Sequence, residues 1–201
     1  DRSVSRGLGD VYKRQVLDCG CGGGANIKTL LKLCPKGKVQ GIDYSAVSVE
    51  KARKVNAGAI AAGRCTVQQA SVAELPFEAE QFEVVTAFET VYFWPELVQN
   101  FREVYRVLKP GGVFFICNEA NGETAKDDKW TQIINGMTIY TDTALKTYLE
   151  QAGLSTKKSE NTLLSAECKK MYQKLWQKER GLDDASPLVG HNCAIIAPIS
   201  A

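Results

Sequence analysis

A short apolar run that leads into closely spaced glycines constrains the fold of this chain more than any other feature. Residues 16–24 read VLDCGCGGG, and residues 25–34 follow with apolar side chains on one helical face. Glycines accept positive φ angles and let the backbone approach a ligand closely, and a helix N-terminus offers unpaired N–H groups. The pattern predicts a strand, a tight turn and a helix with a ligand at the turn. A tight turn that binds nothing is the plainer alternative.

Strand and helix patterns alternate along the chain from residue 16 to about residue 158. The expected strands are residues 16–19, 39–42, 65–69, 82–87, 113–117 and 154–158, and the expected helices are residues 25–34, 45–62, 95–108 and 142–152. Residues 119–140 read as polar and irregular. Such alternation predicts an α/β fold with right-handed crossovers, in which helices flank both faces of a doubly wound, mostly parallel sheet.

The two ends of the chain differ from this central region. Residues 1–15 show no periodicity and are expected to be a non-native or disordered tail. Residues 16–160 are expected to form one ligand-binding domain, which is an ordinary size. Residues 161–201 have no assigned structure, although residues 165–180 read as a charged helix and residues 193–199 as a strand that could complete the sheet.

Composition narrows the partners and the compartment. The net charge is +2, which predicts no nucleic-acid partner, and the apolar runs are too short to span a membrane. Seven scattered cysteines argue against a disulfide framework and favour the cytoplasm. No metal site is expected, because His191 is the only histidine and has no ligand cluster around it. The sequence does not indicate which oligomeric state the protein adopts.

Two ligand classes fit the glycine turn. Gly20, Gly22 and Ala25 match a dinucleotide-binding fingerprint, and Asp43, 23 residues after Gly20, suits a ribose hydroxyl in either case. Asp18 separates the two, because a carboxylate beside the turn would repel a pyrophosphate. It would favour the ammonium and sulfonium charges of S-adenosylmethionine, directly or through an ordered water. The charge argument favours S-adenosylmethionine and leaves an NAD-dependent oxidoreductase as the less favoured alternative.

Five short motifs then occur in order along the chain. They are residues 16–24 (VLDCGCGGG), 41–45 (GIDYS), 71–77 (SVAELPF), 82–89 (FEVVTAFE) and 106–112 (RVLKPGG). In this order and spacing they resemble the class I S-adenosylmethionine-dependent methyltransferases that act on small molecules. The resemblance covers about residues 16–158 and implies a Rossmann-like methyltransferase fold.

The resemblance also implies a set of cofactor-binding residues. Asp18, Gly20, Gly22 and Gly24 would surround the methionine part of the donor. Asp43 would bind the ribose with Tyr44 beside the adenine, Ser71 and Val72 would line the adenine pocket, and Ala87, Phe88 and Glu89 would border the transferring methyl group. Ser71 stands where many members of the family carry an acidic residue.

The acceptor side is expected at the exits of the strands at residues 82–87 and 113–117. Residues 88–94 (FETVYFW) are the densest aromatic stretch, so Tyr92, Phe93 and Trp94 could wall an apolar acceptor pocket, with Glu89 as a polar handle or as a catalytic base. Packing against the next helix is the alternative. Glu119 is a weaker candidate for the same acceptor site. Trp130 and Tyr140 could form a flap over the acceptor or a plain surface loop.

The sequence thus predicts a methyltransferase that acts by in-line displacement on a small molecule, which it does not identify. The alternative from a different class is a catalytically impaired module that binds S-adenosylmethionine without transferring its methyl group.

Overall fold

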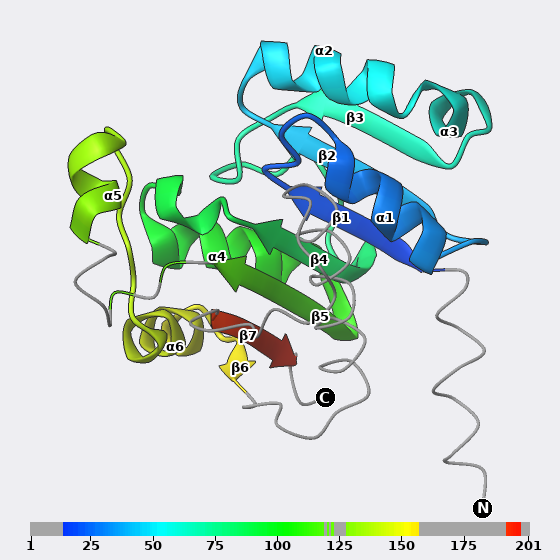
Figure 1. Cartoon of the computed structure of the whole chain (residues 1–201). Helices are drawn as coiled ribbons and strands as arrows, with labels where there is room; N and C mark the ends of the chain where they lie inside the picture. The colour runs from blue at the N-terminus through cyan, green and yellow to red at the C-terminus, as the bar shows by residue number, and fades with distance from the viewer. Residues whose placement is uncertain (1–13, 119, 121, 123–127, 157–191, 198–201) are drawn as a thin grey trace, which may run out of the picture.

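One twisted sheet with helices on both faces forms the body of the molecule (Figure 1). The computed structural model describes residues 14–118, 120, 122, 128–156 and 192–197. The tail before residue 14, the expected helix at residues 165–180, Glu119 and His191 lie outside the described residues. No helix in the described part of the chain has the length and apolarity needed to cross a bilayer.

Within the described residues the sheet has seven strands, in the order β3-β2-β1-β4-β5-β7-β6. The strands are β1 (Gln15–Cys19), β2 (Lys38–Asp43), β3 (Cys65–Gln69), β4 (Phe82–Phe88), β5 (Leu108–Asn118), β6 (Ser155–Thr156) and β7 (Asn192–Ala197). The first five are parallel, and β7 runs antiparallel between β5 and β6. This confirms the predicted doubly wound, mostly parallel sheet. The strand order reverses between β1 and β4, where open α/β sheets bind their ligands.

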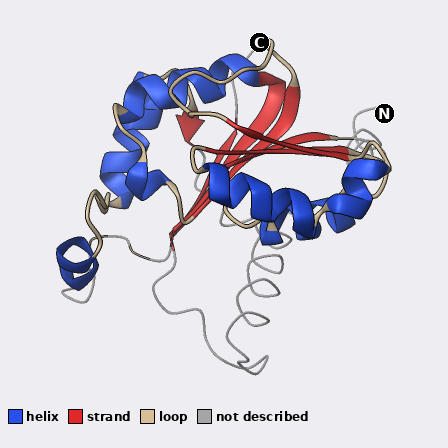
Figure 2. Cartoon of the chain, turned by 90° about the horizontal axis from the view of Figure 1, so that it is seen from above, coloured by secondary structure: helices blue, strands red, loops and turns tan. Residues whose placement is uncertain are grey.

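Two helical layers cover the sheet (Figure 2). The helices are α1 (Ala25–Leu33), α2 (Ala46–Val55), α3 (Ala57–Ala61), α4 (Leu97–Val107), α5 (Asp128–Ile133) and α6 (Asp142–Gln151). Helices α1 to α3 pack in one apolar cluster and α4 and α6 in the other. Successive side chains of β1 point to opposite faces of the sheet. Val16 packs in the cluster with α1, and Leu17 packs in the cluster with α4.

The helix expected at residues 45–62 is two helices that meet at Asn56. Ser45 caps α2, because its hydroxyl accepts a hydrogen bond from the Ser48 N–H. At the break, the buried Asn56 amide donates to the carbonyl oxygens of Ala52 and Gly24. The side chain of Asn56 thereby joins the end of α2 to the start of α1.

Other elements differ from their expected bounds. Strand β1 begins at Gln15, inside the expected tail, and the N–H of Gln15 donates to Glu83. Helix α4 begins at Leu97, because Glu96 before it adopts a left-handed φ of 41°. Strand β5 starts at Leu108 directly after α4, earlier than the strand expected at residues 113–117. The irregular region at residues 119–140 contains α5.

Candidate active site

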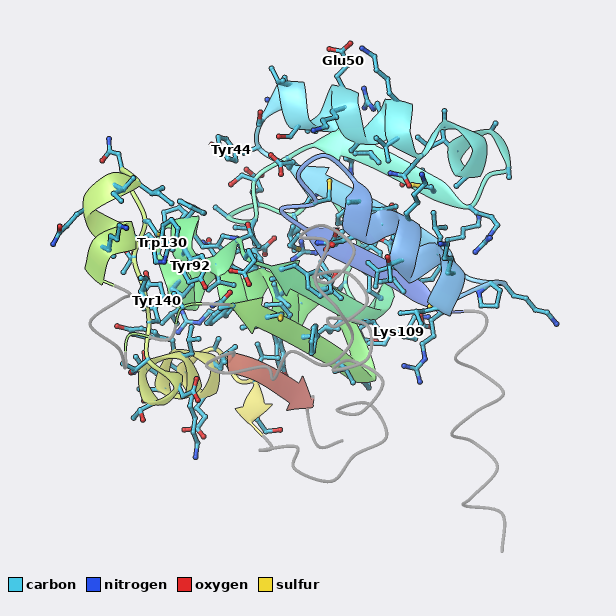
Figure 3. The ribbon with its side chains drawn as sticks, viewed as in Figure 1. Tyr44, Glu50, Tyr92, Lys109, Trp130 and Tyr140 are labelled. Atoms are coloured by element: carbon cyan, nitrogen blue, oxygen red, sulfur yellow. The ribbon has the colours of Figure 1, made fainter. Side chains whose placement is uncertain are left out.

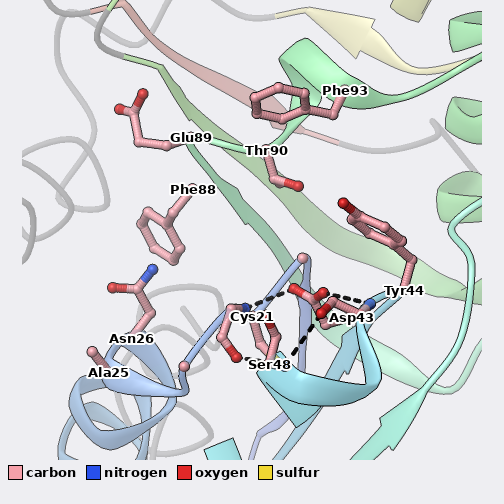
Figure 4. A pocket seen from close by; sticks show the side chains of 14 residues that line it. Cys21, Ala25, Asn26, Asp43, Tyr44, Ser48, Phe88, Glu89, Thr90 and Phe93 are labelled. Atoms are coloured by element: carbon pink, nitrogen blue, oxygen red, sulfur yellow. Dashed lines mark hydrogen bonds between the residues drawn. The ribbon is translucent and has the colours of Figure 1, made fainter. Parts of the chain in front are cut away.

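A pocket of about 540 Å³ opens at the carboxyl ends of β1, β2 and β4 (Figure 4). Its walls come from the glycine turn, the first residues of α1, the segment that joins β2 to α2, and the segment that leaves β4. The residues predicted from the sequence that line it are Gly20, Gly22, Asp43, Tyr44, Phe88, Glu89 and Phe93. The structure thus places these seven residues of the predicted donor and acceptor sites around one space at the switch point of the sheet.

Asp43 connects the glycine turn to the end of β2. Its Oδ2 accepts a hydrogen bond from the Gly22 N–H, and its Oδ1 accepts one from the Ser45 N–H, each at 2.9 Å. Two carboxylate oxygens have room for about four hydrogen bonds. Each oxygen therefore keeps acceptor capacity toward the pocket, which is what the two hydroxyls of a ribose require.

The backbone of the glycine turn is fixed on β2. The N–H groups of Gly20 and Cys21 both donate to the Ile42 carbonyl oxygen at 2.9 Å. Gly20 has a φ of +76°, and a Cβ there would lie 2.1 Å from the Thr90 Oγ1. Gly24 has a φ of +81° and faces away from the pocket, because a Cβ there would meet Asn56 and Ala52. Gly20 thus shapes the pocket, whereas Gly24 packs against α2.

Asp18 lies beneath the turn and does not line the pocket. Its side chain is 1% exposed, its Oδ1 accepts a hydrogen bond of 2.7 Å from the Thr86 hydroxyl, and its Oδ2 has no partner in the described structure. Burial raises the pKa of the Asp18 carboxyl to about 7, against the lowering effect of the Thr86 hydrogen bond, and the Asp43 carboxylate adds to the rise. A nearby cation would favour the ionised form.

The burial of Asp18 predicts that binding of the expected cationic donor depends on pH. A pKa raised from 3.8 means that the ligand-free fold is most stable, relative to Asp18→Asn, below about pH 4 and loses that stability as the pH rises through 7. A cationic donor favours ionised Asp18, so its affinity should fall about tenfold from pH 8 to pH 6. Calorimetry with S-adenosylmethionine measures this fall, and Asp18→Asn should remove it. An unchanged affinity between these two pH values would contradict the assignment.

The loop after β3 carries Ser71 and Val72, the residues expected at the adenine. Ser71 is exposed, Val72 packs against the α4 cluster, and neither lines the pocket. The loop is held farther along, where the Arg106 guanidinium donates to the carbonyl oxygens of Leu75 and Phe77. Contacts of Ser71 and Val72 with adenine stay predictions, as does the contact of the buried Ala87 with the methyl group.

The acceptor side of the pocket is formed by the segment that leaves β4. Phe88 and the half-exposed Phe93 provide apolar surface, and Glu89 adds a carboxylate. Glu89 has a left-handed φ of 55°, a backbone conformation that residues other than glycine rarely adopt. Its N–H donates to the Cys117 carbonyl oxygen at 2.8 Å, so the strained residue is held by β5.

Tyr92 and Trp94, two residues of the expected aromatic wall, do not reach the pocket. Both are buried. The Tyr92 hydroxyl donates to Glu89 Oε2 at 3.1 Å and accepts a hydrogen bond from the Ala120 N–H at 2.8 Å. Trp94 stacks on Phe114 in the core, with ring centroids 6.1 Å apart. The short helix at Val91–Phe93 turns both side chains inward and leaves Phe93 at the pocket.

Trp130 and Tyr140, the two residues expected in a flap, differ in how far they are packed against the rest of the molecule (Figure 3). Trp130 on α5 is 44% exposed, whereas the Tyr140 ring packs edge to face on Tyr148 of α6 with centroids 5.9 Å apart. The Thr138 N–H donates to the Tyr92 carbonyl oxygen, which ties this segment to the residues that leave β4. Movement of the segment over the acceptor stays a prediction.

Thr90 and Asn26 line the pocket although the sequence did not single them out. Asn26 lies in the first turn of α1, a position that the glycine motif could have indicated. Thr90 owes its place to packing against Gly20, which is 70 residues earlier in the chain. No local pattern marks such a contact.

Comparison with known proteins decides between the two ligand classes. A family model described as a methyltransferase domain matches residues 17–116, about half of the chain. The chain belongs to the class I S-adenosylmethionine-dependent methyltransferases. S-adenosylmethionine is the methyl donor of this family, so the dinucleotide alternative gains no support.

Methyltransferases of known sequence match the same region. The chain is 35% identical over 107 residues to demethylmenaquinone methyltransferase of Symbiobacterium thermophilum, which is 53% of this chain and 42% of that protein. It is 31% identical over 102 residues to cycloartenol-C-24-methyltransferase 1 of Oryza sativa subsp. japonica, or 51% of this chain and 29% of that protein. The chain therefore spans less than half the length of these curated relatives.

Solved methyltransferase structures share the fold. A Haloferax volcanii methyltransferase in complex with the Trm112 activator superposes with a TM-score of 0.72 at 18% identity, over 94% of this chain and 85% of that one. Geranyl diphosphate C-methyltransferase of Streptomyces coelicolor A3(2) superposes with a TM-score of 0.67 at 14% identity, over 92% of this chain and 73% of that one. At these identities the likeness establishes the fold alone.

Proposed function

We propose that this methyltransferase transfers a methyl group from S-adenosylmethionine to a small, partly apolar acceptor bound between Phe88, Glu89 and Phe93. One observation carries the proposal: a single pocket joins the glycine turn and Asp43 to the apolar segment that leaves β4. A donor seated on the first half would point its reactive end toward the second half. Holding two reactants in line is most of what such a transfer requires.

The donor half suits S-adenosylmethionine in its chemistry. Asp43 has acceptor capacity for the ribose hydroxyls, and the exposed Tyr44 offers an aromatic face for the adenine. The Asp18 Oδ2, which has no hydrogen-bond partner among the described residues, lies beneath the turn, where it favours positive charge over a pyrophosphate. When bound, the donor supplies an activated methyl group on a sulfonium, and the chain supplies binding, orientation and exclusion of water.

Glu89 is the proposed base for an acceptor that must lose a proton. As the acceptor atom forms its bond to the methyl carbon, the carbon–sulfur bond breaks and its electron pair stays on sulfur. The acceptor's proton then passes to the Glu89 carboxylate. The Tyr92 hydroxyl holds that carboxylate through its hydrogen bond to Oε2.

The relatives guide the choice of acceptor class. The similar proteins are named for demethylmenaquinone and for cycloartenol, which are small molecules with large apolar parts. Phe88 and Phe93 would present apolar surface to an acceptor of this kind.

The cytoplasm remains the proposed compartment, supported by the five buried free cysteines of the described chain: Cys19, Cys21, Cys34, Cys65 and Cys117.

Transfer of a labelled methyl group tests the proposal. The purified chain is incubated with methyl-labelled S-adenosylmethionine and a panel of quinol and sterol acceptors, and extracted products are counted. Wild type should label at least one acceptor, and Glu89→Gln should lower kcat on a hydroxyl acceptor about 100-fold while donor affinity stays unchanged.

Tyr105→Phe on α4 is the control variant, since Tyr105 does not line the pocket and packs beside Gly153. It should retain wild-type turnover. Donor binding without transfer to any acceptor would favour the impaired binding module instead. Equal turnover in wild type and Glu89→Gln would remove Glu89 from the reaction.

A further inference from the structure

Thr90 has a hydroxyl whose hydrogen-bond direction is set by a neighbour. Its Oγ1 accepts a hydrogen bond of 3.3 Å from the Trp94 indole N–H. An indole nitrogen can only donate, so the Thr90 oxygen must use a lone pair there and keeps its own proton for another partner. Among the described residues, no protein acceptor receives that proton. The Thr90 O–H is therefore a donor for whatever occupies the pocket that Thr90 lines.

The side chain lies over the glycine turn. A Cβ built on Gly20 would be 2.1 Å from the Thr90 Oγ1 and 2.7 Å from its Cβ, so Thr90 occupies the space that a side chain at position 20 would need. Figure 4 shows Thr90 between Phe93 on the acceptor side and Asp43 and Tyr44 on the donor side. Its hydroxyl thus stands where the methionine part of a donor on Gly20 and Gly22 would lie.

The chemistry of that part of the donor leaves one partner for an O–H group. The methionine part carries an ammonium, a sulfonium and a carboxylate, and of these charged groups only the carboxylate accepts hydrogen bonds. We propose that the Thr90 hydroxyl binds the methionine carboxylate of S-adenosylmethionine and selects ligands that carry it. This inference rests on the proposed donor. Asp18 beneath the turn favours the positive groups, so the two residues would sort the charges of the same ligand.

Two ligands that differ only in this carboxylate test the inference. S-Adenosylhomocysteine and its decarboxylated analogue are titrated by calorimetry into wild type, Thr90→Val and Thr90→Ser. Wild type should bind S-adenosylhomocysteine at least tenfold more tightly than the analogue, as expected for a hydrogen bond to a charged group. Thr90→Val should lose about tenfold for S-adenosylhomocysteine and little for the analogue, and Thr90→Ser should behave as wild type.

The control is Thr147→Val on α6, because Thr147 is exposed and its hydroxyl donates to the Thr143 carbonyl oxygen of its own helix. It should leave both affinities unchanged. Thermal unfolding of each variant shows that the fold is retained, and Thr90→Ser preserves the hydroxyl if the valine variant is unstable. If Thr90→Val binds S-adenosylhomocysteine within twofold of wild type, or loses equally for both ligands, the assignment to the carboxylate is overturned. Failure of wild type to bind either ligand would overturn the proposed donor itself.

Discussion

Gly20→Ala is expected to abolish binding of S-adenosylhomocysteine and to lower the free energy of unfolding by about 3 kcal/mol. The residue has a φ of +76°, which costs an alanine roughly 1–2 kcal/mol. The added methyl would also lie 2.1 Å from the Thr90 Oγ1, so the segment that leaves β4 must move. Overpacking of this kind costs a further ~1–3 kcal/mol. Because Thr90 lines the pocket, the same movement disturbs the site.

Gly63→Ala is the matched control for this variant. Gly63 has a φ of +68°, and a Cβ there meets no heavy atom within 4 Å. It should therefore show the backbone cost alone, about 1–2 kcal/mol, with unchanged ligand affinity. Urea unfolding and calorimetry measure both quantities. Equal losses of stability in the two variants, together with retained binding in Gly20→Ala, would show that the close packing of Thr90 on Gly20 is wrong.

Asp43→Asn should weaken S-adenosylhomocysteine binding by about 100-fold, or ~3 kcal/mol. The carboxylate accepts hydrogen bonds from Gly22 and Ser45 through different oxygens. An amide has only one oxygen, so its NH₂ group would face one of these N–H groups and leave that donor unpaired. The amide also provides fewer acceptors for the ribose hydroxyls. The variant therefore loosens the turn and loses direct contacts with the ligand.

Glu50→Gln is the control for the loss of one negative charge near α2. Glu50 points away from the pocket on the outer side of α2 (Figure 3), where it forms an exposed ion pair with Lys54. Such pairs contribute ~0–1 kcal/mol, so both stability and affinity should stay close to wild type. Calorimetry of both variants at one pH provides the comparison. Binding by Asp43→Asn within threefold of wild type would remove Asp43 from the donor site.

The sequence predicts the sheet well because parallel strands carry a strong local signal. A strand buried on both faces reads as a short apolar run, as β1, β4 and the second half of β5 do. The edge strand β3 instead alternates the buried Cys65 and Val67 with the exposed Thr66. The break between α2 and α3 at Asn56 has no such local signal, because the Asn56 side chain donates a hydrogen bond to the carbonyl oxygen of Gly24, 32 residues away in the chain. The left-handed Glu96, which sets the start of α4, likewise follows no periodic pattern.

The site divides in the same way. Gly20, Gly22 and Asp43 follow from a motif because the strand ends that carry them are fixed by the fold. For residues 88–94 the sequence shows only that the stretch is rich in aromatic residues. Composition alone does not determine which of these side chains face the pocket. The backbone turn at Val91–Phe93 decides that Phe93 faces the pocket and Trp94 faces the core. Thr90 becomes visible only once the glycine turn and the exit of β4 are in contact.

Calorimetric titration of the purified chain with S-adenosylhomocysteine, beside an identical titration with NADH, tests the central claim most directly. The pocket between Asp43 and Glu89 predicts saturable, one-to-one binding of S-adenosylhomocysteine and no binding of NADH. A folded chain that binds NADH, and does not bind S-adenosylhomocysteine, would contradict the assignment of the glycine turn to a methyl donor.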